Sequence, residues 1–307
     1  MSETTGAGGV APTPTRRVHL PARGTFVVLA PLTGESLEAA LRAHQNNRGT
    51  AACLKWKYDT LVTRIPVESC PGSEALVSSG EIVVKEVPLP WRRKVLCRLG
   101  VPSRFERDFE RYERLAAFGF RAPRVLGASF VPKGDREYQF TAFAAGDTLG
   151  DLLWMSDTRA VDADMRSSLL HSVGKSVRAL HERGVWQRDL NPLNLLLQRP
   201  DDGWTPLLLD ITALRFFSKP LPRARRLRNL AQLVDLPKRL EEKATKDLLD
   251  GYLKNDAADR KAWERELREG VNRRRARRLR RTGFRYIDDE HYGTASHTGE
   301  LPKRTAE

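Results

Sequence analysis

The chain has 307 residues, of which 40% are hydrophobic, and its formal net charge is +14. This length accommodates one two-lobed domain with a full core and short tails. The three cysteines (Cys53, Cys70 and Cys97) lack metal-ligand spacing, which argues against a disulfide framework or a zinc site and favours a reducing compartment. No apolar run is long enough to cross a membrane. Residues 1–19 are polar and rich in Gly, Pro and Thr, so we expect a disordered segment and no signal peptide.

The first predicted elements are β-structure. Residues 55–64, with Asp59-Thr60 as a turn, are expected to form a hairpin. Residues 81–87 form a β-branched strand with a single lysine, Lys85. A lone lysine on a strand is usually solvated, but this one precedes an acidic loop by about a hundred residues, and its position relative to that loop gives it significance.

A helix is predicted after this strand. Ser103 and Glu106 have the spacing of a capping box, and apolar residues then repeat at helical spacing. The apolar face is formed by Phe105, Phe109, Tyr112 and Ala116. We therefore expect this helix to pack one face against the strands.

One acidic residue, Asp108, falls inside the apolar stripe of that helix. A buried carboxylate needs a partner, and Lys85 is the natural candidate. Aspartate is one methylene shorter than glutamate, so Glu110 or Glu113 would take the role if the helix were rotated.

The most informative stretch follows a helix predicted for residues 165–183. It runs from 188 to 197 with the sequence RDLNPLNLLL. Asp189 can accept a proton from a substrate hydroxyl, and Asn194, five residues later, can hold a metal ion bound to nucleotide phosphates. The alternative is an ordinary turn followed by a buried strand.

A second carboxylate is expected across the metal site. Asp201-Asp202-Gly203 reads as a turn, and residues 206–209 form a short apolar strand that ends at Asp210. Asp210 takes the place of the metal-binding aspartate of kinases, although Ile211 and Thr212 follow it. An aspartate that merely caps the next turn is the alternative.

Basic residues gather in two clusters. The first contains Arg223, Arg225, Arg226 and Arg228, and the second extends from residue 273 to 281. A helix over residues 272–281 is expected, and its arginines suit an anionic membrane surface, with a solvated helix as the alternative. Nucleic acid is the least favoured partner, because aromatic residues are not interleaved with the arginines.

Taken together, these motifs resemble the lipopolysaccharide kinase family, the Kdo and heptose kinases of the bacterial inner core. The resemblance runs from about Leu54 to Leu253 and rests on Lys85 and the following motifs: Ser103-Arg104 leading to residues 119–123 (GFRAP), residues 181–185 (HERGV), Asp189 with Asn194, residues 210–216 (DITALRF) and residues 226–233 (RLRNLAQL).

The chain departs from the protein-kinase pattern at three places. Gln187 stands where kinases have the histidine of His-Arg-Asp. Asn191 stands where kinases of Ser and Thr usually have a lysine, which favours a sugar acceptor. No Gly-x-Gly-x-x-Gly precedes Lys85, so the 55–64 hairpin is expected to cover the phosphates.

The resemblance implies an α+β, two-lobed protein-kinase-like fold with a β-rich N-lobe and a mainly helical C-lobe. The N-lobe is expected at 20–140 and the C-lobe, with its basic helix, at 141–287, followed by a flexible tail at 288–307. The hinge would lie at 141–144, where the backbone of Ala142 and Ala144 can meet adenine.

The implied function is transfer of the γ-phosphate of ATP to a sugar hydroxyl, most simply of Kdo or heptose. Asp189 would act on the hydroxyl, Asn194 and Asp210 would hold magnesium, and Lys85, paired with Asp108, would position the phosphates. The partners are ATP and a sugar or glycolipid acceptor, in the cytoplasm or at the inner face of its membrane. A kinase of proteins or other small molecules, and a scaffold without activity, are the alternatives.

Overall fold

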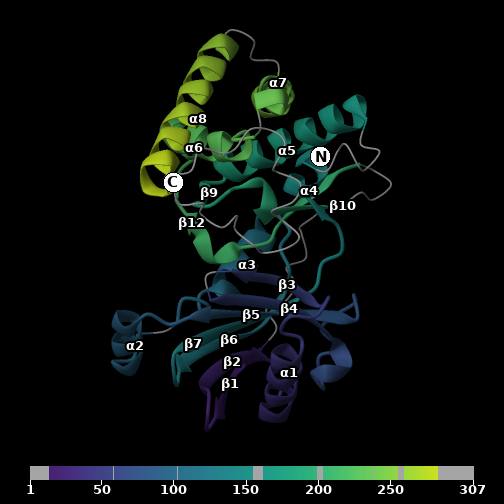
Figure 1. Cartoon of the computed structure of the whole chain (residues 1–307), viewed down its shortest axis with the longest axis vertical. Coiled ribbons are helices and arrows are strands. Elements are labelled where there is room, and N and C mark those ends of the chain that lie inside the picture. The colour runs from purple at the N-terminus through teal and green to yellow at the C-terminus, as the bar shows by residue number, and fades with distance from the viewer. Residues whose placement is uncertain are drawn as a thin grey trace, which may run out of the picture. The chain divides into compact units, whose positions relative to one another are not determined.

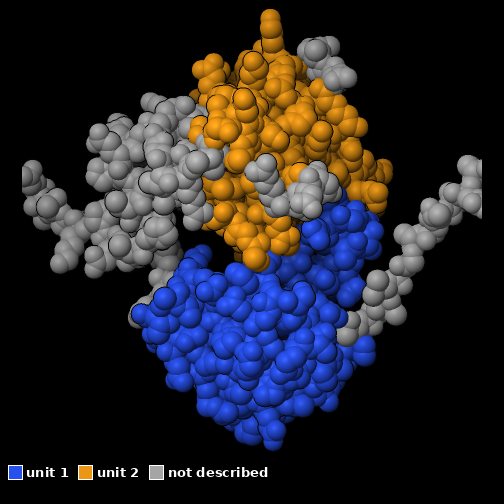
Figure 2. Space-filling view, turned by 90° about the vertical axis from the view of Figure 1, so that its right-hand side faces the viewer, with its two compact units in different colours: residues 1–144 blue, residues 145–307 orange. Residues whose placement is uncertain are grey.

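The computed structural model describes residues 14–57, 59–101, 103–154, 162–198, 203–236, 238–254 and 259–282. The chain divides into two compact units, residues 1–144 and 145–307, which are coloured separately in Figure 2. Unit 1 is β-rich and unit 2 is mainly helical (Figure 1), which confirms the predicted α+β class. The expected turn residues Asp201 and Asp202 and the expected tail at 288–307 lie outside the described residues.

Unit 1 is built on a seven-stranded antiparallel sheet in the order β1-β2-β6-β7-β5-β4-β3. The predicted hairpin is β3 and β4, with Asp59 in the left-handed conformation of a tight turn (φ 60°), and the predicted lysine strand is β5. The strands are β1 (Thr15–Leu20), β2 (Gly24–Leu29), β3 (Cys53–Lys57), β4 (Thr60–Pro66), β5 (Glu81–Pro88), β6 (Val125–Pro132) and β7 (Arg136–Ala142).

The first strand lies partly within the segment that was expected to be disordered. β1 begins at Thr15, which pairs with Leu29 of β2, and the Arg16 guanidinium donates to the carbonyl of Leu32 at 2.9 Å. A strand hydrogen-bonded along its whole length is ordered by its neighbour, and local composition does not reveal this.

Three helices accompany the sheet of unit 1. Helix α1 (Gly34–Asn46) begins with a capping box between Thr33 and Ser36 and packs its apolar face against the sheet. Helix α2 (Trp91–Arg98) packs against β6, and α3 covers residues Asp108–Ala117. A 3₁₀ turn, η1, spans Val67–Ser69.

The capping box predicted at Ser103 is wrong. The Ser103 hydroxyl accepts a hydrogen bond from the backbone N–H of Phe105 at 3.1 Å, which forms a local turn, and α3 begins only at Asp108. The side chain of a serine can satisfy a nearby N–H in a turn as well as at a helix start, so the spacing alone does not distinguish the two.

In unit 2 the helices pack around short strands. Helices α5 and α7 approach closely because Gly174 and Gly251 face the opposing backbone, where a Cβ atom would collide with it. The predicted helix at 165–183 is α5, capped by the Asp162 side chain. The helices are α4 (Leu149–Trp154), α5 (Ala163–Glu182), α6 (Arg223–Leu233), α7 (Lys238–Leu253) and α8 (Arg260–Thr282).

The strands of unit 2 form two small sheets. One contains β8 (Asp147–Thr148), β10 (Leu195–Gln198) and β11 (Thr205–Leu208), and the other pairs β9 (Val185–Gln187) with β12 (Leu214–Phe216). The 3₁₀ turns η2 (Pro192–Asn194) and η3 (Ile211–Ala213) lie at their ends. These sheets place the residues after β9 and after β11 next to each other.

Candidate active site

The predicted site residues fall into two groups, one in each unit. Asp189, Asn194 and Asp210 belong to unit 2, whereas Lys85, Asp108, Ala142 and Ala144 belong to unit 1. Each group is described by itself.

In unit 2 the loop between β9 and β10 brings Asp189 and Asn194 together. The Asn194 side-chain N–H donates to the backbone carbonyl of Asp189 at 2.9 Å, and the same nitrogen lies 3.4 Å from the Asp189 carboxylate. The carboxylate of Asp189 is exposed. Because the amide nitrogen of Asn194 is turned toward Asp189, its oxygen is the end of the side chain that is suited to a metal ion.

Asp210 follows β11 and lies beside this loop. Strands β10 and β11 pair with Leu195 opposite Leu208, and the N–H of Leu209 donates to the carbonyl of Asn194 at 3.0 Å. The Asp210 carboxylate accepts from the N–H of Thr212 at 3.2 Å, so it does cap the turn that follows. A carboxylate has about four lone-pair sites, so a capping bond does not by itself exclude a cation at the same group.

Gln187 links the two acidic positions. Its side chain is buried, its amide N–H donates to the carbonyl of Asp210, and its oxygen accepts from the N–H of Asp189 at 3.3 Å. The residue that departs from the kinase pattern therefore connects the backbone at both carboxylates. A neutral amide does this without a titrating group.

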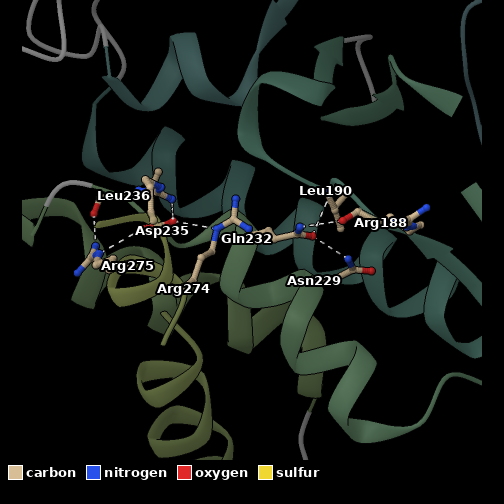
Figure 3. A network of polar contacts seen from close by, with 9 residues as sticks. Arg188, Leu190, Asn229, Gln232, Asp235, Leu236, Arg274 and Arg275 are labelled. Carbon is tan, nitrogen blue, oxygen red and sulfur yellow. Dashed lines mark hydrogen bonds and ion pairs between the residues drawn. The ribbon is translucent and has the colours of Figure 1, made fainter. Parts of the chain in front are cut away.

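Two side chains of α6 hold the backbone of the same loop (Figure 3). The Gln232 amide donates to the carbonyl of Arg188 at 2.9 Å and accepts from the N–H of Leu190 at 3.1 Å. Asn229, one helical turn earlier, donates to the carbonyl of Gln187 at 2.6 Å and to the Gln232 oxygen at 3.0 Å. Both amides are buried, so together they fix the backbone on either side of Asp189.

Sequence reasoning missed these two amides. They lie three residues apart, on the face of α6 that is turned to the interior of unit 2. A polar residue on a buried helical face needs partners, and this is the signal that would have identified them. The motif at 226–233 contributed only to the family resemblance.

A buried histidine, His181, contacts the side chain of Asn229. The two ring nitrogens of His181 lie 2.9 Å from the Tyr252 hydroxyl and 3.1 Å from the Asn229 amide oxygen. Burial lowers the pKa of His181 to about 4, and the charge of Arg226 acts in the same direction, against the hydrogen bond to Asn229. The imidazole is therefore neutral near pH 7.

Three arginines of α8 have a structural role. Arg274 and Arg275 donate to the Asp235 carboxylate at 2.9 and 3.2 Å, and Arg278 donates to it as well. Asp235 follows the end of α6 and is buried, so these contacts attach α8 to α6 (Figure 3). The basic run is helical as predicted, but part of its charge is used within unit 2.

An open groove of about 570 Å³ runs between α6 and α8. Its lining contains the small or apolar residues Ala224, Leu227, Ala231 and Gly270, together with Glu266 and five arginines. The arginines are Arg223, Arg228, Arg273, Arg274 and Arg277. The lining thus combines apolar residues with a strong excess of cationic ones.

In unit 1, Asp108 is buried as predicted. Arg111 and the Gln139 amide both donate to its carboxylate, the latter at 2.5 Å. Lys85 of β5 lies directly opposite Gln139 of β7 in the sheet, which brings the lysine into the neighbourhood of Asp108. Gln139 was not foreseen, and its place follows from a strand register that the sequence does not reveal.

The alternatives to Asp108 point elsewhere. Glu110 is exposed and pairs with Arg114 at 3.6 Å, and Glu113 is also exposed. Asp108 is therefore the acidic residue that α3 turns toward the sheet.

The predicted hinge begins where β7 ends. The N–H of Ala142, the last residue of β7, donates to the carbonyl of Arg124 at 2.9 Å, and the N–H of Phe143 donates to that of Glu81 at 2.9 Å. Ala144 is the final residue of unit 1. The segment thus lies at the boundary between the units.

The residues after β9 and β11 offer oxygen ligands to a cation. Within the described part of the chain, no group of three His, Cys, Asp or Glu residues is arranged to hold a metal by itself. Magnesium does not require such a cage, because it is commonly bound by one or two carboxylates together with substrate phosphates. Asn194 and Asp210 fit that mode.

Comparison with known proteins gives one family. The model of the lipopolysaccharide kinase (Kdo/WaaP) family matches residues 91–252, which include Asp108, Asp189, Asn194 and Asp210 but not Lys85. A solved structure described as WaaP in complex with acyl carrier protein is 16% identical, with a TM-score of 0.47, and the match covers 74% of this chain and 92% of that one. No curated protein matches the sequence.

Proposed function

Since the chain belongs to the lipopolysaccharide kinase (Kdo/WaaP) family, we propose that it transfers the γ-phosphate of ATP to a sugar hydroxyl of the lipopolysaccharide inner core, on Kdo or heptose. Membership of a kinase family assigns phosphotransferase activity. The acceptor, the nucleotide and the residues that act on them are the parts that we propose.

The observation that carries the proposal is the arrangement of unit 2. Asp189 and Asn194 are joined within one loop, Gln187 links that loop to Asp210, and α6 holds the backbone on both sides of Asp189. Phosphoryl transfer depends on placement and charge neutralisation, and a loop held by buried amides supplies placement.

In this mechanism the exposed Asp189 carboxylate orients the acceptor hydroxyl and takes its proton as the hydroxyl oxygen bonds to the γ-phosphorus of ATP; the bond from that phosphorus to the β-phosphate oxygen breaks, and ADP leaves. Asn194 and Asp210 would hold magnesium, which would neutralise phosphate charge. Lys85 supplies a positive charge for the phosphates, while Asp108 and Gln139 fix the local geometry of unit 1. Backbone at Ala142 and Ala144 receives adenine.

The acceptor is lipid-linked in this proposal. No helix within the described residues is long and apolar enough to span a membrane. The arginines of the 273–281 cluster, apart from those bound to Asp235, would then contact an anionic membrane surface at the cytoplasmic face, with roughly 1 kcal/mol of attraction per basic residue near that surface.

A panel of acceptors tests this proposal. The purified chain with ATP and magnesium is expected to phosphorylate a deacylated inner-core oligosaccharide, and not a general protein acceptor or an aminoglycoside. Preference for either of the latter would replace the sugar assignment. A scaffold without activity would show no transfer and no thermal shift with nucleotide, whereas ATP at about a hundred times its dissociation constant should stabilise a kinase by about 2.7 kcal/mol.

A further inference from the structure

Large hydrophobic side chains that are exposed concentrate at one place in unit 1. Five of the eight that the described residues expose lie between 91 and 101, on α2 and the turn after it. Trp91 is 71% exposed and Leu99 is 76% exposed, and the others are Val95, Leu96 and Val101. Single exposed apolar residues are ordinary, but a contiguous group marks an interaction site.

The orientation of α2 is the reverse of that of an ordinary surface helix. Cys97 is buried and Arg93 and Lys94 are half-buried, so this side faces the sheet, where α2 packs on β6. At about 100° per residue, Trp91, Val95 and Leu99 fall together on the opposite side. Figure 1 shows α2 at the margin of unit 1. The apolar face of α2 is therefore its outer face.

Two exposed basic residues, Arg92 and Arg98, border this apolar face. Between Val87 and Phe105 the chain has five basic residues and no acidic one. Of these, Arg92 and Arg98 are exposed, Arg93 and Lys94 are half-buried toward the sheet, and Arg104 is bound to the buried Glu137. The Arg92 guanidinium lies 5.6 Å from the centre of the Trp91 ring. An apolar face with tryptophan at one end and a cationic border is the pattern of a helix that lies in a membrane interface.

We propose that α2 and the following turn, residues 91–101, insert their apolar face into the surface of an anionic lipid bilayer. The charge favours this occupant over a second copy of the chain, because a symmetric contact would place the two basic borders against each other. A helix of eight residues is about 12 Å long, so it lies on the membrane and does not cross it.

This inference deepens the proposed function, because a lipid-linked acceptor lies in such a surface. It also alters the membrane contact expected from sequence. The 273–281 cluster supplies charge, whereas residues 91–101 supply apolar area, and stable attachment generally needs both kinds of signal.

Vesicle binding without nucleotide tests the inference. The full chain is expected to co-sediment with vesicles of phosphatidylglycerol and phosphatidylcholine in equal amounts, and only weakly with phosphatidylcholine alone. The double variant Trp91→Ser/Leu99→Ser should bind the anionic vesicles about tenfold more weakly or worse. Leu54→Ser, which changes another exposed leucine of unit 1, should bind as the unchanged chain does.

Two further variants locate the contact. Trp91→Phe keeps the apolar face, so it should still bind but should lose the fluorescence quenching by brominated lipid that is due to Trp91. Arg92→Gln/Lys94→Gln/Arg98→Gln should weaken binding to anionic vesicles and reduce its salt dependence. All variants should melt at the temperature of the unchanged chain, because the altered side chains point outward or are only partly covered.

Three outcomes would overturn the inference. The first is vesicle binding by the double variant equal to that of the unchanged chain, and the second is unchanged fluorescence quenching in Trp91→Phe. The third is that the unchanged chain does not bind vesicles but forms a dimer or a complex with an acidic protein, and that the double variant no longer forms it. Failure of the kinase proposal is separable. In that case no phosphate would be transferred to the deacylated acceptor, a reaction that needs no membrane. If the kinase proposal holds, the double variant should phosphorylate this acceptor at the rate of the unchanged chain.

Discussion

The loop that carries Asp189 in unit 2 and the strand that carries Lys85 in unit 1 are supported by different kinds of contact. Neutral amides (Gln187, Asn229 and Gln232) hold the loop, whereas the buried Asp108 beside the strand is held by Arg111 as well as by Gln139. Buried amides keep their hydrogen bonds across a wide pH range, while a buried carboxylate has to remain ionised to keep a charged partner.

The two regions are therefore proposed to contribute in different ways, the loop by positioning its backbone and the strand by the charge of Lys85. In the proposed mechanism the loop of unit 2 acts through the position of its backbone, so we expect its support to be sensitive to the loss of a donor or acceptor. In the same mechanism the strand of unit 1 acts through the charge of Lys85, so we expect its function to be sensitive to the loss of that charge. The following variants distinguish these two modes, in order of decreasing effect.

Removal of the charge at residue 85 should have the largest effect. Lys85→Met keeps the length of the side chain, and kcat/KM is expected to fall by about 10²–10³-fold, since the positive charge stabilises phosphate oxygens in the transition state. Steady-state kinetics would measure this, with Lys133→Met as a control in which an exposed lysine of unit 1 is changed. A change of less than about twofold would remove Lys85 from the site.

Removal of an amide under the loop should affect stability and activity together. Gln232→Leu leaves the Leu190 N–H and the Arg188 carbonyl without their partner, and a free energy of unfolding lower by roughly 3–5 kcal/mol is expected. Urea denaturation checks this. Gln198→Leu, which loses one exposed bond to Ala145, is the matched control and should cost less than about 1 kcal/mol. Similar losses in both variants would contradict a special role for α6.

Acid should destabilise unit 2 through His181. The His181 imidazole takes up a proton only near pH 4 in the folded chain but near pH 6.5 in the unfolded chain. Because the unfolded state is protonated first, the free energy of unfolding falls as the pH decreases between these values. Between about pH 7 and about pH 5 the loss from this residue is about 2 kcal/mol.

The pH dependence of His181→Phe isolates this contribution. The variant should be less stable near neutral pH, because the Asn229 oxygen and the Tyr252 hydroxyl lose a partner, but its stability should decline less on acidification. Glu86 also makes the unchanged chain and the variant less stable at low pH. Burial raises the pKa of Glu86, but the hydrogen bond and charge of His44 and the charge of Arg136 outweigh burial and lower the pKa. Parallel pH curves would show that His181 is not the source.

Release of α8 should have the smallest effect. Asp235→Asn removes the charge that binds Arg274, Arg275 and Arg278, and we expect a loss of about 1–2 kcal/mol, since these arginines are partly exposed and can be hydrated. Thermal melting measures it. Glu269→Gln removes an exposed pair with Arg273 and should change stability by less than about 0.5 kcal/mol. Equal values would mean that Asp235 does not attach α8.

The sequence predicted the elements that follow local rules. The strand with Lys85, the helix before Asp189 and the burial of Asp108 appear as expected, because periodicity and spacing report them directly. The error at Ser103 arose where one side chain can serve either a turn or a helix cap.

Other features depend on contacts between distant residues. The β5–β7 register places Gln139 where it can donate to Asp108. Gln232 bonds to Leu190 in the Asp189 loop although the two residues are 42 positions apart in the sequence. The outward apolar face of α2 was hidden for the same reason, since only its packing on β6 shows which side of that helix is outside.

Phosphate transfer by Asp189→Asn tests the central claim most directly. The substitution removes the carboxylate but leaves the backbone carbonyl that accepts from Asn194, so the loop should keep its shape. With a deacylated inner-core acceptor and labelled ATP, kcat is expected to fall by at least about 10²-fold while the thermal shift with ATP and magnesium is retained. Transfer at the rate of the unchanged chain would contradict the assignment of Asp189 as the residue that acts on the acceptor hydroxyl.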